Sequence, residues 1–186
     1  MIDILLTASS TFLKGENAQN ITNLLLSIFT VIEFSSFAFF LSKALKSPIS
    51  TKVALFAIFI FIPVCIVNWF FLPKYGANLD TIPVVSQALV IMPLCVMFYF
   101  EQIKNPVNLF IYSTPNFWVV TSILIYLSGT FFIFLYSMNL SEKELVDYWA
   151  INYFFNILKN LLFGVAVYLQ ARGTKEEEIP FNQNLT

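Results

Sequence analysis

Long apolar stretches recur along this chain and are separated by short polar segments. Five of them are long enough to cross a bilayer as helices, at about residues 21–45, 53–72, 82–100, 116–138 and 148–171. A membrane helix needs about 20 consecutive, mostly apolar residues, and each stretch is close to that length. The pattern therefore predicts an all-α integral membrane protein, a bundle of five transmembrane helices that occupies residues 21–172.

Two segments lie outside this apolar pattern. Residues 1–20 begin with a short apolar run but lack the basic residues of a secretory signal, so we predict a segment at the membrane surface. Residues 173–186 contain Glu176, Glu177 and Glu178 followed by a polar end, which predicts a disordered tail. A run of this kind is more often a solvated end than a docking motif.

Composition narrows the class of protein. The chain has 186 residues, of which 58% are hydrophobic and 11% are charged, whereas soluble domains average about 25% charged residues. Such a chain cannot cover itself with polar groups, so membrane lipids are an expected partner. The net charge of −1 gives no reason to expect a nucleic-acid partner.

The chain contains no histidine, which removes the commonest general base and the commonest metal ligand. Cys65 and Cys95 both lie inside apolar stretches, where a thiol is most often a small buried hydrophobic group. We therefore expect no disulfide framework, no metal site and no cofactor.

The distribution of basic residues predicts the orientation in the membrane. Five spans place the two ends of the chain on opposite sides. One side would hold Lys43, Lys46, Lys52, Lys104, Arg172 and Lys175, and the other Lys14, Lys74 and Lys143. Because cytoplasmic loops carry the excess of lysine and arginine, we predict an outside N-terminus and a cytoplasmic C-terminus in a bacterial inner membrane.

The fifth stretch carries Asn152, Asn156, Lys159 and Asn160, whose spacing predicts a single stripe on a helix. A lysine in the middle of a membrane span needs a partner, and Glu33 is the carboxylate in the middle of the first stretch. Both residues lie about 12 residues into their spans, so they share one depth. We predict that the first and fifth helices are neighbours and that Glu33 and Lys159 form an intramembrane ion pair.

Other polar residues of the spans would lie in the same outer half. Together with the asparagines of the fifth stretch they predict a polar pocket above the ion pair, lined by Asn68, Gln87, Tyr126, Asn152, Asn156 and Asn160. Each asparagine alone could instead join helices by hydrogen bonds, and the ion pair could serve only to fix helix register. Pro63 and Pro93 fall inside the second and third stretches, where they predict helix kinks.

The sequence gives little support for an enzyme. Ser35, Ser36, Ser86 and Ser128 lie in the spans, but no histidine is present to activate them. A serine–lysine arrangement that uses Lys159 is formally open. No nucleophile elbow, zinc-protease motif or phosphate-binding loop occurs, so we expect no catalytic residue.

Three segments carry a resemblance to a known group. The patterns IEFSSFAFF, FWVVTSILIYLSGTFF and YWAINYFFNILKNLLFGVA resemble small, uncharacterised, Phe-rich bacterial integral membrane proteins. That group is similar to the membrane input modules found with sensor kinases. The resemblance rests mainly on hydropathy, implies a module that acts through a partner, and carries over no catalytic residue.

Three functions remain open at this point. The first is a membrane-embedded sensory or partner-binding module with a polar pocket between helices, which acts through a protein partner or a homo-oligomer and binds a small ligand. The second is a small transporter or channel subunit that uses Glu33 and Lys159 as coupling groups. The third is a membrane-disrupting effector, for which toxicity on expression would be the discriminating observation.

Overall fold

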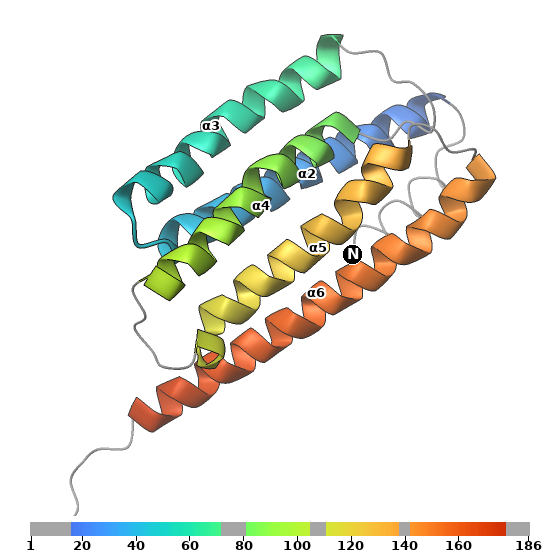
Figure 1. Ribbon diagram of the computed structural model, residues 1–186. Coiled ribbons are helices and arrows are strands. Elements are labelled where there is room, and N and C mark those ends of the chain that lie inside the picture. Colours follow the sequence, from blue (N-terminus) through green and yellow to red (C-terminus); the bar gives the residue numbers. More distant parts are fainter. Residues whose placement is uncertain (1–15, 72–80, 105–110, 138–141, 178–186) are drawn as a thin grey trace, which may run out of the picture.

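Five long helices make up nearly all of the part of the chain that the structure, a computed structural model, describes: residues 16–71, 81–104, 111–137 and 142–177 (Figure 1). They are α2 (Glu16–Ala44), α3 (Pro48–Phe71), α4 (Thr81–Lys104), α5 (Pro115–Ser137) and α6 (Glu142–Glu177), with a short 3-10 turn η1 (Ile111–Ser113) before α5. Each long helix contains an apolar segment long enough to cross a membrane. The predicted all-α fold with five spans is confirmed.

Several helices are longer than the predicted spans. α2 begins at Glu16 rather than near residue 21. α3 begins at Pro48 rather than near residue 53, because the fixed φ of proline suits the first turn of a helix. α6 continues to Glu177, so residues 173–177 are helical and not part of a disordered tail as predicted. Predictions about residues 1–15 and 178–186 fall outside the described residues.

The helices pack mainly against their neighbours in sequence. α2 packs on α3 and α4, α4 packs on α5, and α5 packs along α6, which lies at the edge of the assembly (Figure 1). Among the described residues α6 makes no comparable contact with α2. The prediction that the first and fifth spans are neighbours is therefore wrong, because α5 supplies the surface on which α6 packs.

Aromatic and small side chains hold α2 against α3. The rings of Phe34 and Phe61 stack with centroids 3.9 Å apart and planes inclined by 12°, an arrangement that adds about 0.5–1.5 kcal/mol beyond simple burial. Ala38 and Ala54 are completely buried on the same two helices. Small residues let helix backbones approach closely, so packing rather than hydrophobic burial favours this contact within lipid.

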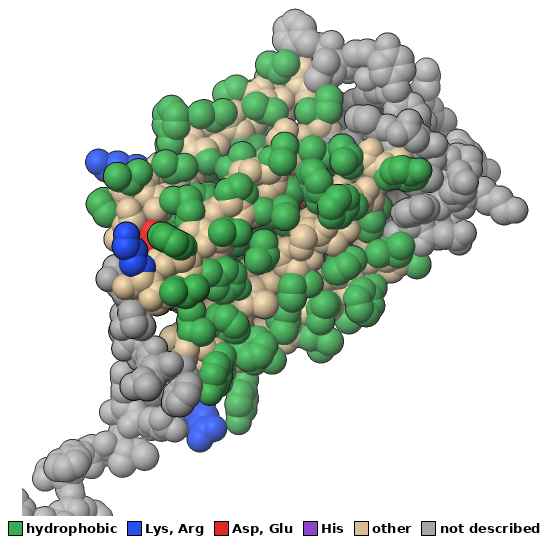
Figure 2. Space-filling view, in the orientation of Figure 1, with side chains coloured by type: hydrophobic (Ala, Val, Ile, Leu, Met, Phe, Trp, Pro, Cys, Tyr) green, Lys and Arg blue, Asp and Glu red, His purple; other side chains and the backbone are tan. Residues whose placement is uncertain are grey.

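The outer surface of the bundle differs from that of a soluble protein. Large apolar side chains lie on the outside, with Phe59 73% exposed and Ile103 77% exposed, and Figure 2 shows such side chains spread over the visible face. The interior is mostly apolar as well, but it also holds polar side chains, among them Gln87, Ser122 and Thr130. Water would not tolerate this arrangement, but hydrocarbon favours it. The protein is a multi-pass membrane protein.

Pro63 and Pro93 lie inside the continuous helices α3 and α4. A proline nitrogen cannot donate, so the carbonyls of Phe59 and Leu89, four residues earlier, lose their usual helical partner. Each of the two helices therefore lacks one backbone hydrogen bond within its span, as expected. The predicted kinks themselves stay predictions.

Glu101, near the end of α4, ties that helix to the connection between α2 and α3. Its Oε2 accepts hydrogen bonds from the backbone N–H groups of Lys46 (2.7 Å) and Ser47 (3.3 Å), and its Oε1 accepts one from Ser50 Oγ (2.8 Å). A carboxylate in this position satisfies donors at the beginning of α3 and complements the helix dipole. One side chain thus joins the ends of three helices.

Replacing Glu101 by alanine is expected to lower the free energy of unfolding by about 1–2 kcal/mol, the usual effect of losing a helix cap. The measurement is chemical unfolding of the full chain in detergent micelles. Gln102→Ala is the matched control, because the bond that the Gln102 side chain accepts from Lys46 Nζ is exposed. Equal losses in the two variants would contradict the capping role.

Gly129 lies where α5 packs against α6. A Cβ added at this glycine would collide with the ring of Phe155, whereas one added at Gly164 on α6 would meet open space. Both glycines lie inside membrane helices, but only the position of Gly129 is too crowded for a larger side chain. Gly129 permits α6 to pack along α5, as small residues do in helix interfaces.

The substitution Gly129→Ala is expected to cost about 1–3 kcal/mol, because the Phe155 ring must move to make room. Gly164→Ala is the control and is expected to change stability by no more than about 1 kcal/mol, in the stabilising direction, since alanine favours helix. Unfolding of both variants in a detergent that keeps the protein monomeric provides the comparison. A neutral Gly129→Ala variant would contradict the assigned packing role.

Candidate functional site: a buried charged cluster

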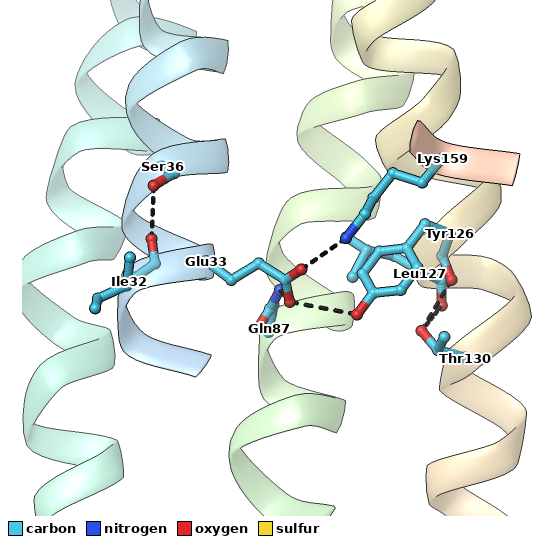
Figure 3. A network of polar contacts seen from close by, with 8 residues as sticks. All are labelled: Ile32, Glu33, Ser36, Gln87, Tyr126, Leu127, Thr130 and Lys159. Atoms are coloured by element: carbon cyan, nitrogen blue, oxygen red, sulfur yellow. Dashed lines mark hydrogen bonds and ion pairs between the residues drawn. The ribbon is translucent and has the colours of Figure 1, made fainter. Parts of the chain in front are cut away.

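Glu33 is the centre of the most polar region inside the bundle. Its Oε1 accepts a hydrogen bond from Lys159 Nζ at 3.0 Å, and its Oε2 accepts one from Gln87 Nε2 at 3.1 Å (Figure 3). The hydroxyl of Tyr126 donates a longer bond of 3.5 Å to the same Oε2. One carboxylate of α2 therefore receives donors from α4, α5 and α6. We call Glu33, Gln87, Tyr126 and Lys159 the Glu33 cluster.

Lys159 reaches Glu33 across α5 rather than from a neighbouring helix. Its ammonium lies 3.7 Å from the centroid of the Tyr126 ring and 5.8 Å from that of Phe37. An aromatic face attracts a cation, most strongly where water is excluded. The long lysine stem thus bridges α6 and α2 although these helices do not pack together, and the Tyr126 ring supports it on the way (Figure 3).

The ion pair is largely shielded from solvent, with the side chains of Glu33 and Lys159 each 10% exposed. A lone charge at this depth would be costly, but the two opposite charges give the cluster no net charge. The additional bonds from Gln87 and Tyr126 satisfy the second carboxylate oxygen. A buried ion pair needs such additional hydrogen bonds, because they offset the cost of removing its charges from water.

The remaining residues predicted for the pocket divide into two groups. Asn156 interacts with the Tyr126 hydroxyl and so borders the Glu33 cluster. Asn152 is buried on the side of α6 that carries Lys159, and Asn68 is buried in α3. Asn68 lies seven residues beyond Phe61, and Asn152 lies seven residues before Lys159. Seven residues span about 10 Å along a helix, so both asparagines occupy a different level from the cluster.

Asn160 does not belong to the site. Its side chain is exposed on the outside of α6, whereas Lys159 points inward. Successive residues of a helix are rotated by about 100°, so the residue after an inward lysine points to the flank. The prediction that Asn160 lines the polar pocket is wrong, because this residue lies at the exposed edge of the stripe.

Two buried amide oxygens lack a hydrogen-bond donor among the described residues, one in the cluster and one farther along α6. Gln87 Oε1 and Asn152 Oδ1 have no hydrogen-bond donor within the described part of the chain. Buried amide oxygens usually have one, so each of these atoms can accept a bond from a small ligand. By contrast, the hydroxyls of Ser36 and Thr130 donate to carbonyls of their own helices, Ile32 and Tyr126 (Figure 3).

Phe37 was not anticipated as part of the environment of Lys159. It follows Glu33 by four residues, and this spacing places both on one face of a helix. The signal was present in the sequence, but the chain has 22 phenylalanines and only the tertiary structure distinguishes this one.

Within the described ranges no group of three His, Cys, Asp or Glu side chains could hold a metal ion. Cys65 and Cys95 are buried and are not joined in a disulfide. Comparison with protein-family models, curated proteins and solved structures finds no match for the chain. The resemblance to membrane input modules of sensor kinases therefore stays a prediction, and function has to be inferred from the Glu33 cluster itself.

Replacing Lys159 by methionine should leave Glu33 buried without its cation and lower stability by about 3–5 kcal/mol. Adding Glu33→Gln removes the uncompensated charge and should restore much of that loss. The measurement is a double-mutant cycle on unfolding in detergent. Lys104→Met, which removes an exposed cation at the end of α4, is the control with an expected change within about 0.5 kcal/mol. A double variant no more stable than Lys159→Met would show that the two residues are not coupled.

Proposed function

We propose that this protein is a membrane-embedded sensory or partner-binding module that acts through another protein, with the Glu33 cluster as its switching element. The observation that carries the proposal is the ion pair between Glu33 and Lys159, which joins two helices that do not otherwise pack along each other. A link of this kind has two discrete states, formed and broken. Signalling requires such a two-state element.

α6 suits the transmission of a change in this link. It packs along α5, and the helix continues past Arg172 to Glu177, beyond its membrane span Ala150–Arg172. When the ion pair breaks, the restraint that holds α6 toward α2 is removed. A tilt or rotation of α6 then reaches the end of the helix, where a partner protein can detect it.

The distribution of charge supports an orientation with the N-terminus outside and the C-terminus in the cytoplasm of a bacterial inner membrane. In the described part of the chain, the basic residues near the ends of the spans are Lys43, Lys46, Lys52, Lys104 and Arg172. They lie at the end of the bundle at which α2, α4 and α6 finish their spans. An excess of basic residues is typical of the cytoplasmic side.

A second candidate, a small transporter or channel subunit, is favoured by the free acceptors Gln87 Oε1 and Asn152 Oδ1. A polar substrate with a hydrogen-bond donor could bind Gln87 Oε1, whose side chain contacts the charged pair, and Asn152 Oδ1 about two turns of helix away from Lys159. Glu33 and Lys159 would then be coupling groups, and the prolines of α3 and α4 would provide flexible points. We propose no enzymatic role, since Ser36 and Ser128 donate to carbonyls of their own helices.

The test compares the wild-type chain with the charge-free variant Glu33→Gln/Lys159→Met, which is expected to fold. Spin labels at exposed positions of α3 and α6 in liposomes measure the distance between these helices. For a switching element, the variant is expected to broaden or shift the distance distribution relative to wild type. The control is Lys104→Met, which leaves the ion pair intact and should leave the distances unchanged.

Flux assays in the same liposomes separate the two candidates. The sensory module is expected to show no solute or proton flux above empty liposomes, and to co-purify from native membranes with a partner whose yield changes in the charge-free variant. Flux that disappears on Glu33→Gln would instead establish the transporter. Unchanged helix distances and unchanged partner yield in the charge-free variant would contradict the switching role.

A further inference from the structure

α6 has one side that no part of the described chain covers. It is the edge helix of the bundle and packs along α5 (Figure 1). Only 17% of its membrane span, Ala150–Arg172, is buried inside the molecule, the smallest share among the five spans. The Glu33 cluster uses the inward face through Lys159, so the outward face is available for another contact.

Asn160 distinguishes this outward face from an ordinary lipid-facing surface. It lies close to the midpoint of the span, its side chain is exposed, and it has no hydrogen-bond partner within the described residues. An amide that faces hydrocarbon loses the hydrogen bonds it makes in water and gains none in return. Polar residues at this depth are rarely left facing lipid.

The positions around Asn160 form a seam suited to helix packing. Ile157, Asn160, Gly164, Val167 and Ala171 follow one another at spacings of three and four residues, and all five are exposed. This is the spacing of the contact positions of a left-handed helix pair. Gly164, one turn after Asn160, has open space where a Cβ would project. A second helix backbone can therefore approach closely beside the amide.

We propose that two copies of this chain associate through the outward face of α6, with Asn160 of each copy hydrogen-bonded to Asn160 of the other. Two copies in one membrane share the same orientation, so identical residues lie at identical depth and meet across a two-fold axis. A carboxamide both donates and accepts, which makes it complementary to itself. A single asparagine at such a seam also fixes register and favours a defined pair. The contact does not depend on the proposed function, because its exposed residues lie on a different part of the α6 surface from the buried Lys159.

The test measures self-association of the full-length protein in liposomes over a range of protein-to-lipid ratios, by energy transfer between labelled copies. Asn160→Leu is expected to weaken dimerisation by about 3- to 30-fold, the effect of losing an interhelical hydrogen bond within the membrane. Phe154→Leu is the control, since Phe154 is exposed on another part of the α6 surface. Phe154→Leu is expected to leave the dimer unchanged.

Disulfide trapping gives a second, independent measurement. Cys65 and Cys95 are first replaced by alanine, and single cysteines are then introduced as Asn160→Cys or Phe154→Cys. Oxidation in liposomes is expected to cross-link the first variant between copies and not the second. A monomer at every protein-to-lipid ratio, dimerisation unaffected by Asn160→Leu, or cross-linking through position 154 alone would overturn the proposal. The proposal would also be overturned if the protein did not self-associate but bound a different membrane protein, and if Asn160→Leu abolished that complex.

Discussion

Hydrocarbon offers no hydrogen bonds and little screening of charge, so every ionised group placed in a span has to find its partner inside the protein. The ion pair of Glu33 and Lys159 meets this requirement, with Gln87 and Tyr126 completing the shell of the carboxylate. Four of the five long helices contribute to this one group of side chains. The Glu33 cluster therefore sets which faces of α2, α4, α5 and α6 point toward one another, while the apolar exterior is left to lipid.

The remaining contacts work around this constraint. Between α2 and α3 the stacked rings of Phe34 and Phe61 provide packing, and Gly129 allows α6 to lie close to α5. At the basic end, Glu101 joins α4 to the start of α3. These contacts hold the bundle without the ion pair having to do so alone. The Glu33 cluster can thus change state while the helices keep their neighbours, which is what a sensory module requires.

Much of this fold follows from sequence, because length and hydropathy define membrane spans almost independently of tertiary structure. Matched depth also sufficed to select Glu33 and Lys159 as partners. The arrangement around them did not follow, since a long lysine stem can pair across an intervening helix, and α2 and α6 are not neighbours. Asn160 was misplaced because spacing alone does not say which side of a stripe faces inward. Glu101 was missed because its role depends on a contact between residues far apart in the chain.

The central claim is that Lys159 and Glu33 are in direct contact inside the membrane. Solid-state NMR of the protein in bilayers, with ¹⁵N in the lysine ammonium groups and ¹³C in the glutamate carboxylates, measures this contact through their dipolar coupling. A strong coupling present in the wild-type chain and absent from both Lys159→Met and Glu33→Gln is the predicted result. The account would be contradicted if the wild-type spectrum showed no such coupling, or if the coupling persisted in both variants.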